Sequence, residues 1–541
     1  MEDSQVGKVH DYIVIGAGSA GCVLANRLTE SGKYSVLLLE AGPPDNYPWI
    51  HIPIGYGKTM FNPRYNWMFN TEPEAGLNQR RIYWPRGRCL GGSGSINGLI
   101  YVRGQAEDYD HWQSLGNHGW SWQGVLPYFL KFEKNSRGAS EYHGAEGALY
   151  CSDIGERHEL MEGIIGAGSE LGITRNDDFN GASQEGVGYY QLFTQHGRRC
   201  STSVAYLRPA RKRRNLTVET HAQATRLIAK GSQIQGVCYV QNGVKKQVLC
   251  GKEVILAAGA VQSPQLLQLS GIGNAALLQA HDIPVLKDLP GVGENLQDYL
   301  QLRLMYKVKK AITTNDDLRT LAGKMRIGLK YLFKRRGPLA IGINQGGLFT
   351  RVLPESRTPD IQFHFATLSA DAAGGAPHLW PGCTFSVCQL RPQSRGSIHI
   401  KSRDALQAPA IQANYLSTPT DQRCAVAGIK FARQLASQPA LHGLLDSEHL
   451  PGAAVATDDE LLEFARAYGA TIFHPVGTCK MGSDPMAVVD ARLRVHGVEG
   501  LRVVDASVMP TLTSGNTHAP VVMIAEKAAD MILQDATGKY L

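Results

Sequence analysis

The sequence predicts an α/β protein in which a domain with a parallel sheet is interrupted by a second domain built on an antiparallel sheet. Three observations lead to this prediction: a β-α-β pattern at the start of the chain, further short apolar strands far from it, and alternating apolar residues in the middle. A chain of 541 residues exceeds one ordinary hydrophobic core, so two domains, or one large domain with an elaborate insert, are expected. With 43% apolar and 19% charged residues, the composition is that of a globular protein.

The first element is a β-α-β unit with a glycine-rich turn. An apolar strand at Tyr12–Ile15 leads into the turn and a helix that extends to about residue 28, and a second strand follows at Val36–Leu39. Gly16, Gly18 and Gly21 form the pattern G-x-G-x-x-G in the strand-turn-helix context that this motif requires. Such a turn lets the backbone approach a pyrophosphate, which the free N–H groups of the helix N-terminus can bind.

An acidic residue ends the second strand. Glu40 follows the apolar run Val36–Leu39 directly. A carboxylate at this position can accept hydrogen bonds from both hydroxyls of a ribose, and it would repel a 2′-phosphate, which argues against NADP. The segment therefore predicts a site for an adenine dinucleotide and leaves NAD and FAD open.

Two more strands of the same type lie far along the chain. Val254–Ala258 enters another glycine turn, and Arg502–Val504 ends in Asp505. Because strands of one parallel sheet are spread so widely, we expect the cofactor domain to be discontinuous.

The middle of the chain has a different pattern. Ile361–Ala366 and Phe385–Arg391 alternate or run apolar, Ser397–Lys401 alternates, and turn signals separate them. This pattern predicts an antiparallel sheet that includes all three segments.

A basic amphipathic helix is predicted before this sheet. Two interpretations are open: the apolar stripe packs on the sheet, as in an ordinary surface helix, or it contacts an anionic membrane surface. The apolar positions are Leu318, Leu321, Ala322, Met325, Leu329, Leu332 and Phe333, and the basic positions are Arg319, Lys324, Arg326, Lys330 and Lys334.

The overall charge excludes some classes of partner. A net charge of +7 is mild for this length, and the densest basic runs, Arg208–Arg214 and Lys334–Arg336, are interpreted as solvated faces. The basic runs are not interleaved with aromatic residues, and the sequence has no zinc-ligand spacing, so nucleic-acid binding is not supported. No residue is assigned to a metal. Ten cysteines without C-x-x-C predict reduced thiols. The start does not resemble a signal peptide and no apolar run approaches about 20 residues, so we expect a cytoplasmic protein, with contact at the inner face of the membrane as the second interpretation of the helix.

Several long motifs resemble one enzyme family. Gly87–Asp110 resembles the first signature of the glucose–methanol–choline oxidoreductases, and Gly259–Gly273 resembles the second. Phe473–Gly482, Val503–Ser507 and Gly515–Pro520 also match. The resemblance covers nearly the whole chain and is nearest to bacterial alcohol and choline dehydrogenase-like members.

The resemblance implies FAD, a Rossmann-like FAD domain (residues 1–155, 195–310 and 465–541) and a substrate domain with a six-stranded antiparallel sheet (residues 156–194 and 311–464). Covalent members attach the flavin through a histidine just before the asparagine that matches Asn97. Here that position is Ile96, so we expect dissociable FAD. The expected cofactor-binding residues are Gly16, Gly18, Ser19, Ala20, Gly21, Glu40, Ala41, Trp67, Gly91, Gly92, Ser93, Asn97, Gly98, Leu99, Ile100, Ala224, Ala258, Asp505, Ala506, Thr517, Pro520 and Val521.

Two histidines are the expected catalytic residues. Imidazole has an ordinary pKa of about 6.5 and suits removal of a hydroxyl proton near neutral pH. By resemblance His474 is the base, and His518 binds the substrate oxygen or shares the proton transfer, although many relatives carry asparagine at the second position. Pro520 suits the first turn of a helix whose N–H groups would stabilise negative charge on the reduced flavin.

The expected reaction is oxidation of a primary alcohol, with hydride transfer to flavin N5 and electrons passed to a quinone or another acceptor. An oxidase that uses O₂ and forms H₂O₂ is the nearest alternative. A flavin lyase, a fatty-acid photodecarboxylase and a non-catalytic flavin protein are more distant ones. The pocket is expected to be lined by residues Ile341–Gly347, Phe363–Phe365 and Tyr65–Phe69, which favour an aliphatic or aromatic alcohol over choline. The sequence leaves the alcohol, the acceptor and the oligomeric state open.

Overall fold

A mixed sheet formed by both ends of the chain is the base of the first domain. The computed structural model describes residues 9–372 and 374–538. The strand order is β12-β2-β1-β15-β14-β13, and β26 pairs with β15. The strands are β1 (His10–Ile15), β2 (Val36–Leu39), β12 (Leu216–Glu219), β13 (Ala222–Lys230), β14 (Gln233–Gln241), β15 (Val244–Leu256) and β26 (Leu501–Val503).

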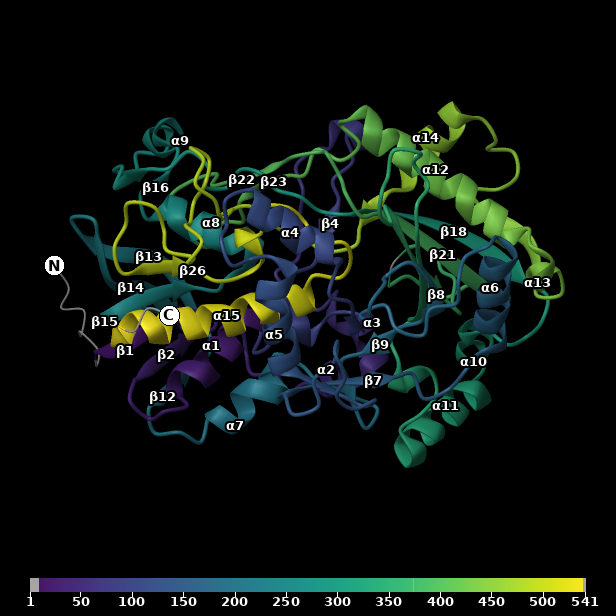
Figure 1. Cartoon of the computed structure of the whole chain (residues 1–541), viewed down its shortest axis with the longest axis horizontal. Coiled ribbons are helices and arrows are strands. Elements are labelled where there is room, and N and C mark those ends of the chain that lie inside the picture. Colours follow the sequence, from purple (N-terminus) through teal and green to yellow (C-terminus); the bar gives the residue numbers. More distant parts are fainter. Residues whose placement is uncertain (1–8, 373, 539–541) are drawn as a thin grey trace.

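The predicted β-α-β unit and the discontinuous sheet are confirmed. Val14 of β1 lies between Leu38 of β2 and Ile255 of β15 in parallel register, and β26 joins β15 on its far side. The long strand β15 is parallel to β1 near its end and antiparallel to β14 near its start, and thereby joins the two halves of the sheet. Helix α1 (Ser19–Thr29) follows β1 and packs against α15 (His518–Thr537) beside this sheet (Figure 1).

Close packing makes one glycine of the turn obligatory. A Cβ on Gly21 would lie 1.8 Å from the carbonyl oxygen of Gly16, so any side chain would push α1 away from β1. This is the helix–strand contact that the spacing of the motif predicts.

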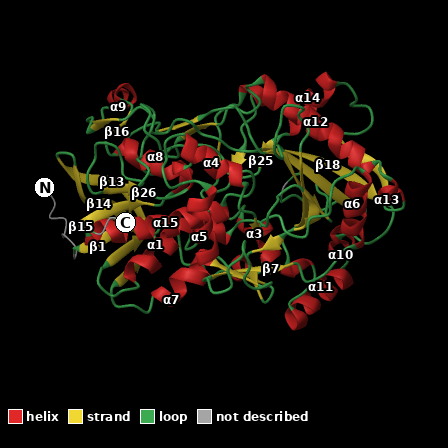
Figure 2. Cartoon of the chain, in the orientation of Figure 1, coloured by secondary structure: helices red, strands yellow, loops and turns green. Residues whose placement is uncertain are grey.

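A second sheet is antiparallel, as expected. Its six main strands are arranged in the order β24-β18-β21-β20-β19-β8. The short strand β25 also belongs to this sheet, because it pairs with β18. The two sheets lie toward opposite ends of the molecule, with helices and loops between them (Figure 2). The strands are β8 (Gly186–Tyr189), β18 (Leu300–Val308), β19 (Asn344–Thr350), β20 (Ile361–Ala366), β21 (Gly382–Gln389), β24 (Leu445–Leu450) and β25 (Ala470–Thr471).

Two expectations about this second sheet need correction. Segment Ser397–Lys401 does not join it: β22 (Ser397–His399) pairs only with β23 (Ala410–Gln412) in a separate two-stranded sheet. Strand β18 lies in the antiparallel sheet, although the predicted FAD domain extended to residue 310. The remaining domain boundaries stay a prediction.

Each sheet has its own hydrophobic core. Strands β1, β2 and β15 pack with α1 and α15 in the first, and strands β18, β20 and β21 pack with α6 and α12 in the second. The other longer helices are α4 (Ala106–Ser114), α5 (Trp122–Phe132), α6 (Glu159–Glu170), α8 (Gly259–Leu269), α9 (Ala275–Ala280), α10 (Thr314–Arg319), α11 (Leu321–Lys334), α12 (Pro419–Ala436) and α14 (Asp458–Tyr468).

The amphipathic helix forms from Leu321 onward, whereas Leu318 and Arg319 of the predicted helix belong to α10, and its apolar stripe faces outward. Helix α11 begins after Thr320, and its buried residues are Gly323, Ile327 and Tyr331, none of which belongs to the predicted stripe. The expectation that the stripe packs on the sheet is therefore wrong, because the packed face is the opposite one.

The state of the cysteines and the character of the helices can be compared with the expectations of reduced thiols and no membrane-spanning segment. All ten cysteines are free thiols, as expected. Among the described residues, no helix combines the length and the apolar character that crossing a membrane requires.

Candidate functional site

A cavity of about 610 Å³ connects the two domains. One end lies at the glycine turn of β1 and reaches Glu40, the middle is walled by Gly92 and Asn97, and the other end reaches His474 and the face of the antiparallel sheet. The glycine turn, the glycine-rich segment and the C-terminal histidine motif are far apart in sequence, and the fold brings all three to this one space.

The carboxylate of Glu40 lies at the end expected for adenosine. Its Oε2 accepts from the backbone N–H of Ala17 at 3.0 Å and its Oε1 accepts from that of Gly42 at 2.9 Å. Burial raises the pKa of Glu40 to about 7, against the effect of these two donors. The side chain is thus fixed by the turn it follows, and it lines the cavity where ribose hydroxyls could donate to it.

Glycines form much of the cavity wall beside the N-terminus of α1. Gly18 is the N-cap of α1 and no side chain caps the helix, so its first N–H groups are available to a ligand. A Cβ on Gly92 would lie 2.7 Å from Cα of Gly18, so the glycine-rich segment can approach the turn this closely only because Gly92 lacks a side chain. This is a cradle for a phosphate group.

A buried arginine, which the sequence analysis missed, holds the glycine-rich segment in place. Arg199 donates from Nη1 to Oδ1 of Asn97 at 2.6 Å, from Nη2 to the Asn97 carbonyl at 2.7 Å, and from Nη1 to the Gly94 carbonyl at 3.2 Å. Burial lowers the pKa of Arg199 to about 9. Arg199 lies in the Arg198–Arg199 strand of a short hairpin. No sequence motif surrounds it, so its role could not be predicted from the sequence.

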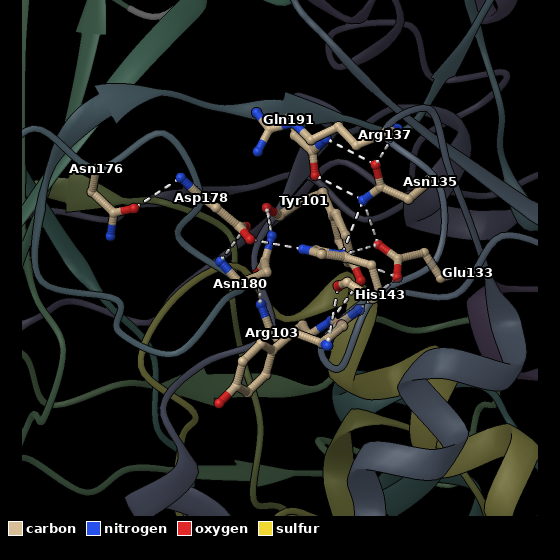
Figure 3. A network of polar contacts seen from close by, with 12 residues as sticks. Tyr101, Arg103, Glu133, Asn135, Arg137, His143, Asn176, Asp178, Asn180 and Gln191 are labelled. Atoms are coloured by element: carbon tan, nitrogen blue, oxygen red, sulfur yellow. Dashed lines mark hydrogen bonds and ion pairs between the residues drawn. The ribbon is translucent and has the colours of Figure 1, made fainter.

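A buried polar network anchors the strand that follows this segment (Figure 3). Arg103, two residues after β5 (Ile100–Tyr101), forms an ion pair with Glu133 at 2.7 Å, and neither side chain is exposed. His143 bridges Glu133 at 2.9 Å and Asp178 at 2.8 Å. Although burial opposes the charged form, the two carboxylates raise the pKa of His143 to about 9. The network ties β5, and with it the cavity wall, to the loops beneath.

His474 lies at the far end of the cavity, as expected for a base. Its backbone N–H donates to Oδ1 of Asp298 at 2.7 Å, and Arg86 donates to the carbonyl of Phe473 at 2.6 Å, so both sides of the loop are held. Burial, the neighbouring His364 and then Arg86 hold the pKa of His474 well below its ordinary value, so the ring is neutral near pH 7. No hydrogen-bond partner satisfies Nδ1 of this histidine among the described residues.

Asn516, rather than His518, is the partner of His474. Nδ2 of Asn516 lies 3.3 Å from Nε2 of His474, and its Oδ1 accepts from Gln362 at 3.2 Å. This arrangement places the Nε2 lone pair of His474 and an amide donor side by side at the cavity wall. Asn516 lies two residues before His518 in the same motif, and the sequence analysis named the motif without assigning a role to this residue.

His518 lines the same cavity but points toward the glycine turn. Its Nδ1 lies 2.9 Å from Oγ of Ser19, and its ring meets Phe193 edge to face at 4.9 Å. Burial, with a contribution from Arg199, lowers its pKa to about 4. Because α15 begins at His518, this side chain turns back toward the N-terminus of α1, whereas Asn516 still lies in the preceding loop. His518 and His474 line the same cavity, but no hydrogen bond joins them among the described residues, so a catalytic role of His518 stays a prediction.

The substrate end is more polar than expected. Phe363 and Phe365 were expected to line it, but both pack in the core of the antiparallel sheet, and His364 between them faces the cavity. The alternation of a strand explains this correction, since neighbouring residues point to opposite faces. Other lining residues at this end are Tyr56, Lys58, Gln301, Arg303, Leu318, Ile343, Asn344, Ala366, Thr384 and Ser386.

Most of the expected cofactor residues share this cavity. The residues that line it are Gly16, Gly18, Ser19, Ala20, Glu40, Ala41, Trp67, Gly92, Ser93, Asn97, Gly98, Leu99, Ile100, Ala224, Ala258, Asp505, Ala506, Thr517 and Val521. Gly21, Gly91 and Pro520 support it from behind: a Cβ on Gly91 would lie 2.1 Å from Oγ of Ser95, and Pro520 lies in the first turn of α15. Asp505 serves mainly through its backbone, because its Oδ2 already accepts from Gly259 at 2.8 Å and Ser263 at 2.6 Å.

These features fit FAD. A carboxylate for the ribose, a cradle without side chains for the pyrophosphate and a glycine-walled slot that ends at His474 follow one another along one cavity. When FAD is bound, its isoalloxazine ring supplies a hydride acceptor.

One possible metal cluster lies outside the cavity. Asp371, His378 and His449 each offer a ligand atom, and these atoms lie within 4.8 Å of one another. Asp371 and His449 are exposed, and none of the three lines the cavity, so the cluster plays no part in the site described above.

Known proteins share the sequence and the fold. Residues 10–301 and 392–525 match the GMC oxidoreductase family. The chain is 44% identical over 530 residues to an alcohol dehydrogenase [acceptor] of Pseudomonas putida, covering 97% of this chain and 96% of that protein. It is also 44% identical to the mitochondrial choline dehydrogenase of Homo sapiens, covering 97% and 89%.

Two solved structures show the same architecture. A pyridoxine 4-oxidase from Mesorbium loti has a TM-score of 0.87 at 31% identity, covering 96% of this chain and 98% of that chain. A formate oxidase from Aspergillus oryzae has a TM-score of 0.93 at 26% identity, covering 99% and 100%. A cavity built for FAD, a neutral histidine at its end and these matches along both domains agree with one another: the chain belongs to the GMC oxidoreductases and is an FAD-dependent enzyme that acts on CH–OH donors.

Proposed function

We propose that this protein oxidises a primary alcohol to the aldehyde, with His474 as the base. The observation that carries the proposal is the pair formed by Nε2 of His474 and Nδ2 of Asn516 at the cavity wall, 3.3 Å apart. An alcohol oxygen that contacts both atoms from the cavity, in place of their direct hydrogen bond, can donate its proton to Nε2 while it accepts a hydrogen bond from the amide of Asn516.

The surroundings of the pair support this division of roles. A neutral imidazole can take up a proton, and the low pKa of His474 keeps it neutral. Asn516 is held at its Oδ1 by Gln362, so its amide N–H, which lies beside Nε2 of His474, would be available to stabilise negative charge that develops on the alcohol oxygen. His518 is instead proposed to help bind the phosphate or ribityl part of FAD, next to Ser19.

Charge at the substrate end favours a neutral alcohol over a cationic one. Only two carboxylates line the described cavity, Glu40 and Asp505, and both belong to the cofactor half. Lys58 and the partly buried Arg303 line the substrate end. A quaternary ammonium group such as that of choline would meet these cations without a counterion, so we propose an aliphatic or aromatic primary alcohol.

We propose non-covalent FAD and electron transfer to a quinone or another acceptor. Ile96 lines the cavity at the place where a histidine would be needed for attachment, and no cysteine lines it in the described residues. Use of O₂ with release of H₂O₂ is the alternative outcome, which a peroxide assay beside a dye-reduction assay distinguishes. The free thiols fit a reducing compartment, and we propose a cytoplasmic enzyme.

Anaerobic reduction of the flavin tests the function and the roles together. Neutral primary alcohols should bleach the flavin absorbance, and choline should do so much more slowly. His474→Ala should slow reduction about 10²–10⁴-fold with FAD retained. Asn516→Ala should slow it by about 10²-fold or more. His518→Ala should instead weaken FAD retention more than it slows reduction.

The exposed His118 provides a matched control. His118→Ala removes an imidazole that does not line the cavity and should leave the reduction rate unchanged. A His474→Ala protein that retains FAD and reacts within tenfold of the wild type would remove this histidine from the mechanism. Hydrocarbon formed from a fatty acid under blue light, without bleaching by alcohols, would favour the photodecarboxylase alternative.

A further inference from the structure

One face of α11 is apolar and points away from the protein. Its large apolar side chains are between 53% and 78% exposed, so residues 9–372 and 374–538 leave more than half of each one uncovered. Their spacing places them on one side of the helix. Helix α11 lies at the edge of the molecule, at the lower right of Figure 1. The exposed face is formed by Leu321, Met325, Leu329, Leu332 and Phe333.

The opposite face fixes this orientation. Ile327 and Tyr331 are buried against the body of the protein. Thr320 caps the helix by accepting from the backbone N–H of Gly323 at 3.0 Å, and Lys330 forms an ion pair with Glu156 at 2.7 Å. The helix is thus held in place with its apolar face outward, and turning it inward would break these contacts.

Positive charge surrounds the apolar face. Residues 314–336 contain seven lysines and arginines and two aspartates. Of the aspartates, Asp317 is already paired with Arg326. Lys324 and Lys334 are exposed and form no ion pair within residues 9–372 and 374–538. A further exposed apolar residue, Leu379, lies beside this region, since its carbonyl accepts from Arg319 at 3.2 Å.

We propose that α11 docks this protein on the surface of an anionic lipid bilayer. An apolar helix face flanked by lysine and arginine is the pattern of a helix that lies in the membrane interface. The apolar side chains would enter the boundary between headgroups and acyl chains, and the basic ones would reach the lipid phosphates. A second copy of the chain is a poorer occupant, because a symmetric contact would place two basic surfaces against each other.

Docking would also bring the cavity toward the lipid. Leu318 lines the cavity three residues before α11 begins, and the exposed Lys58 lies at the same end. An apolar alcohol dissolved in the bilayer would then have a short path to His474. This consequence rests on the proposed function, whereas docking itself does not.

Vesicle co-sedimentation of the FAD-loaded protein tests the proposal directly. The protein should sediment with vesicles of phosphatidylglycerol and phosphatidylcholine and remain largely free with pure phosphatidylcholine. The triple variant Leu329→Ser, Leu332→Ser, Phe333→Ser should lower the partition coefficient at least tenfold. Leu406→Ser is the matched control, because Leu406 is 62% exposed on a different surface loop, and it should bind as the wild type does.

Charge reversal separates electrostatic from apolar binding. Lys324→Glu with Lys334→Glu should also lower binding at least tenfold, and 0.5 M salt should weaken the wild type. Anaerobic flavin reduction by a water-soluble alcohol should stay within twofold in all variants, which shows that they are folded. The proposal is overturned if the wild type ignores anionic vesicles or if the triple variant binds them equally well. It is also overturned if the wild type forms a dimer that the triple variant loses while neither binds vesicles.

Discussion

Glu133→Gln should destabilise the protein more than any surface substitution, because Glu133 is the shared acceptor of a buried network. Its Oε2 accepts from Arg103 at 2.7 Å and from the backbone of Gly144 at 2.8 Å, and its Oε1 contacts His143 at 2.9 Å and accepts from Asn135 at 2.8 Å. Glutamine keeps the shape but replaces one acceptor oxygen with a donor and removes the negative charge. Arg103, which is not exposed, would then lack its buried counterion.

The expected loss is about 3–5 kcal/mol, the cost of removing one partner from a buried ion pair. Unfolding entropy of about 2.1 cal/mol/K per residue gives about 1.1 kcal/mol/K for the 541 residues. The thermal midpoint of the FAD-loaded protein should therefore fall by about 3–4 °C at pH 7. Glu141→Gln is the control: it makes the same change at an exposed residue near His143 and should alter the midpoint by less than about 1 °C.

The effect should also depend on pH in a defined direction. The folded pKa of His143 is raised from 6.5 to about 9, so its contribution to stability is full below pH 6.5 and is lost as the pH rises through about 9. Burial alone would raise the pKa of Glu133, but His143 and then Arg103 lower it, so the contribution of Glu133 is present above pH 4.5 and is lost in acid. The midpoint difference between wild type and Glu133→Gln should be largest between about pH 5 and 6.5 and should shrink as the pH rises toward 9. An equal difference at pH 7 and pH 10, or a loss no greater than that of Glu141→Gln, would refute the reasoning.

Two other outcomes concern the cofactor and the base. Acid precipitation should release all flavin into the supernatant, because Ile96 offers no atom for a covalent link; a yellow pellet would contradict this. Since the pKa of His474 lies well below 6.5, kcat/KM for a neutral alcohol should stay level from pH 8 down through pH 6.5 and decline only in more acidic solution. A decline centred at pH 6.5 or above would count against His474 as a neutral base in this environment.

The cofactor half could be predicted because its chemistry is local in sequence. The motif from Gly16 to Gly21 needs small residues for its turn, and Glu40 comes at the end of the next strand, so both were visible in one short segment. The residues that hold the wall from behind were not visible. Arg199 contacts Asn97 across about a hundred residues of sequence, and nothing in its neighbourhood resembles a motif.

The orientation of α11 shows a different limit. The periodicity of Leu321, Met325 and Leu329 predicted a helix and one apolar stripe, but it could not tell which side faces the protein. Ile327 and Tyr331 form a second apolar line on the other side, and two such lines are enough to hold the helix. The sequence pattern shows that one face of the helix is more apolar than the other. Which face is buried depends on the protein surface against which the helix packs.

The two halves of the cavity differ in how they use side chains, and this difference explains why the cofactor is easier to predict than the substrate. At the FAD end, backbone N–H groups and missing side chains form the wall, so the sequence needs only glycine at a few positions. At the substrate end, the wall is one face of the antiparallel sheet, and a shift of one residue would exchange His364 for its two phenylalanine neighbours. Arg303 and His364 reach the cavity only because of this register. Substitutions on this face of β18 and β20 should therefore change which alcohol is accepted while FAD remains bound.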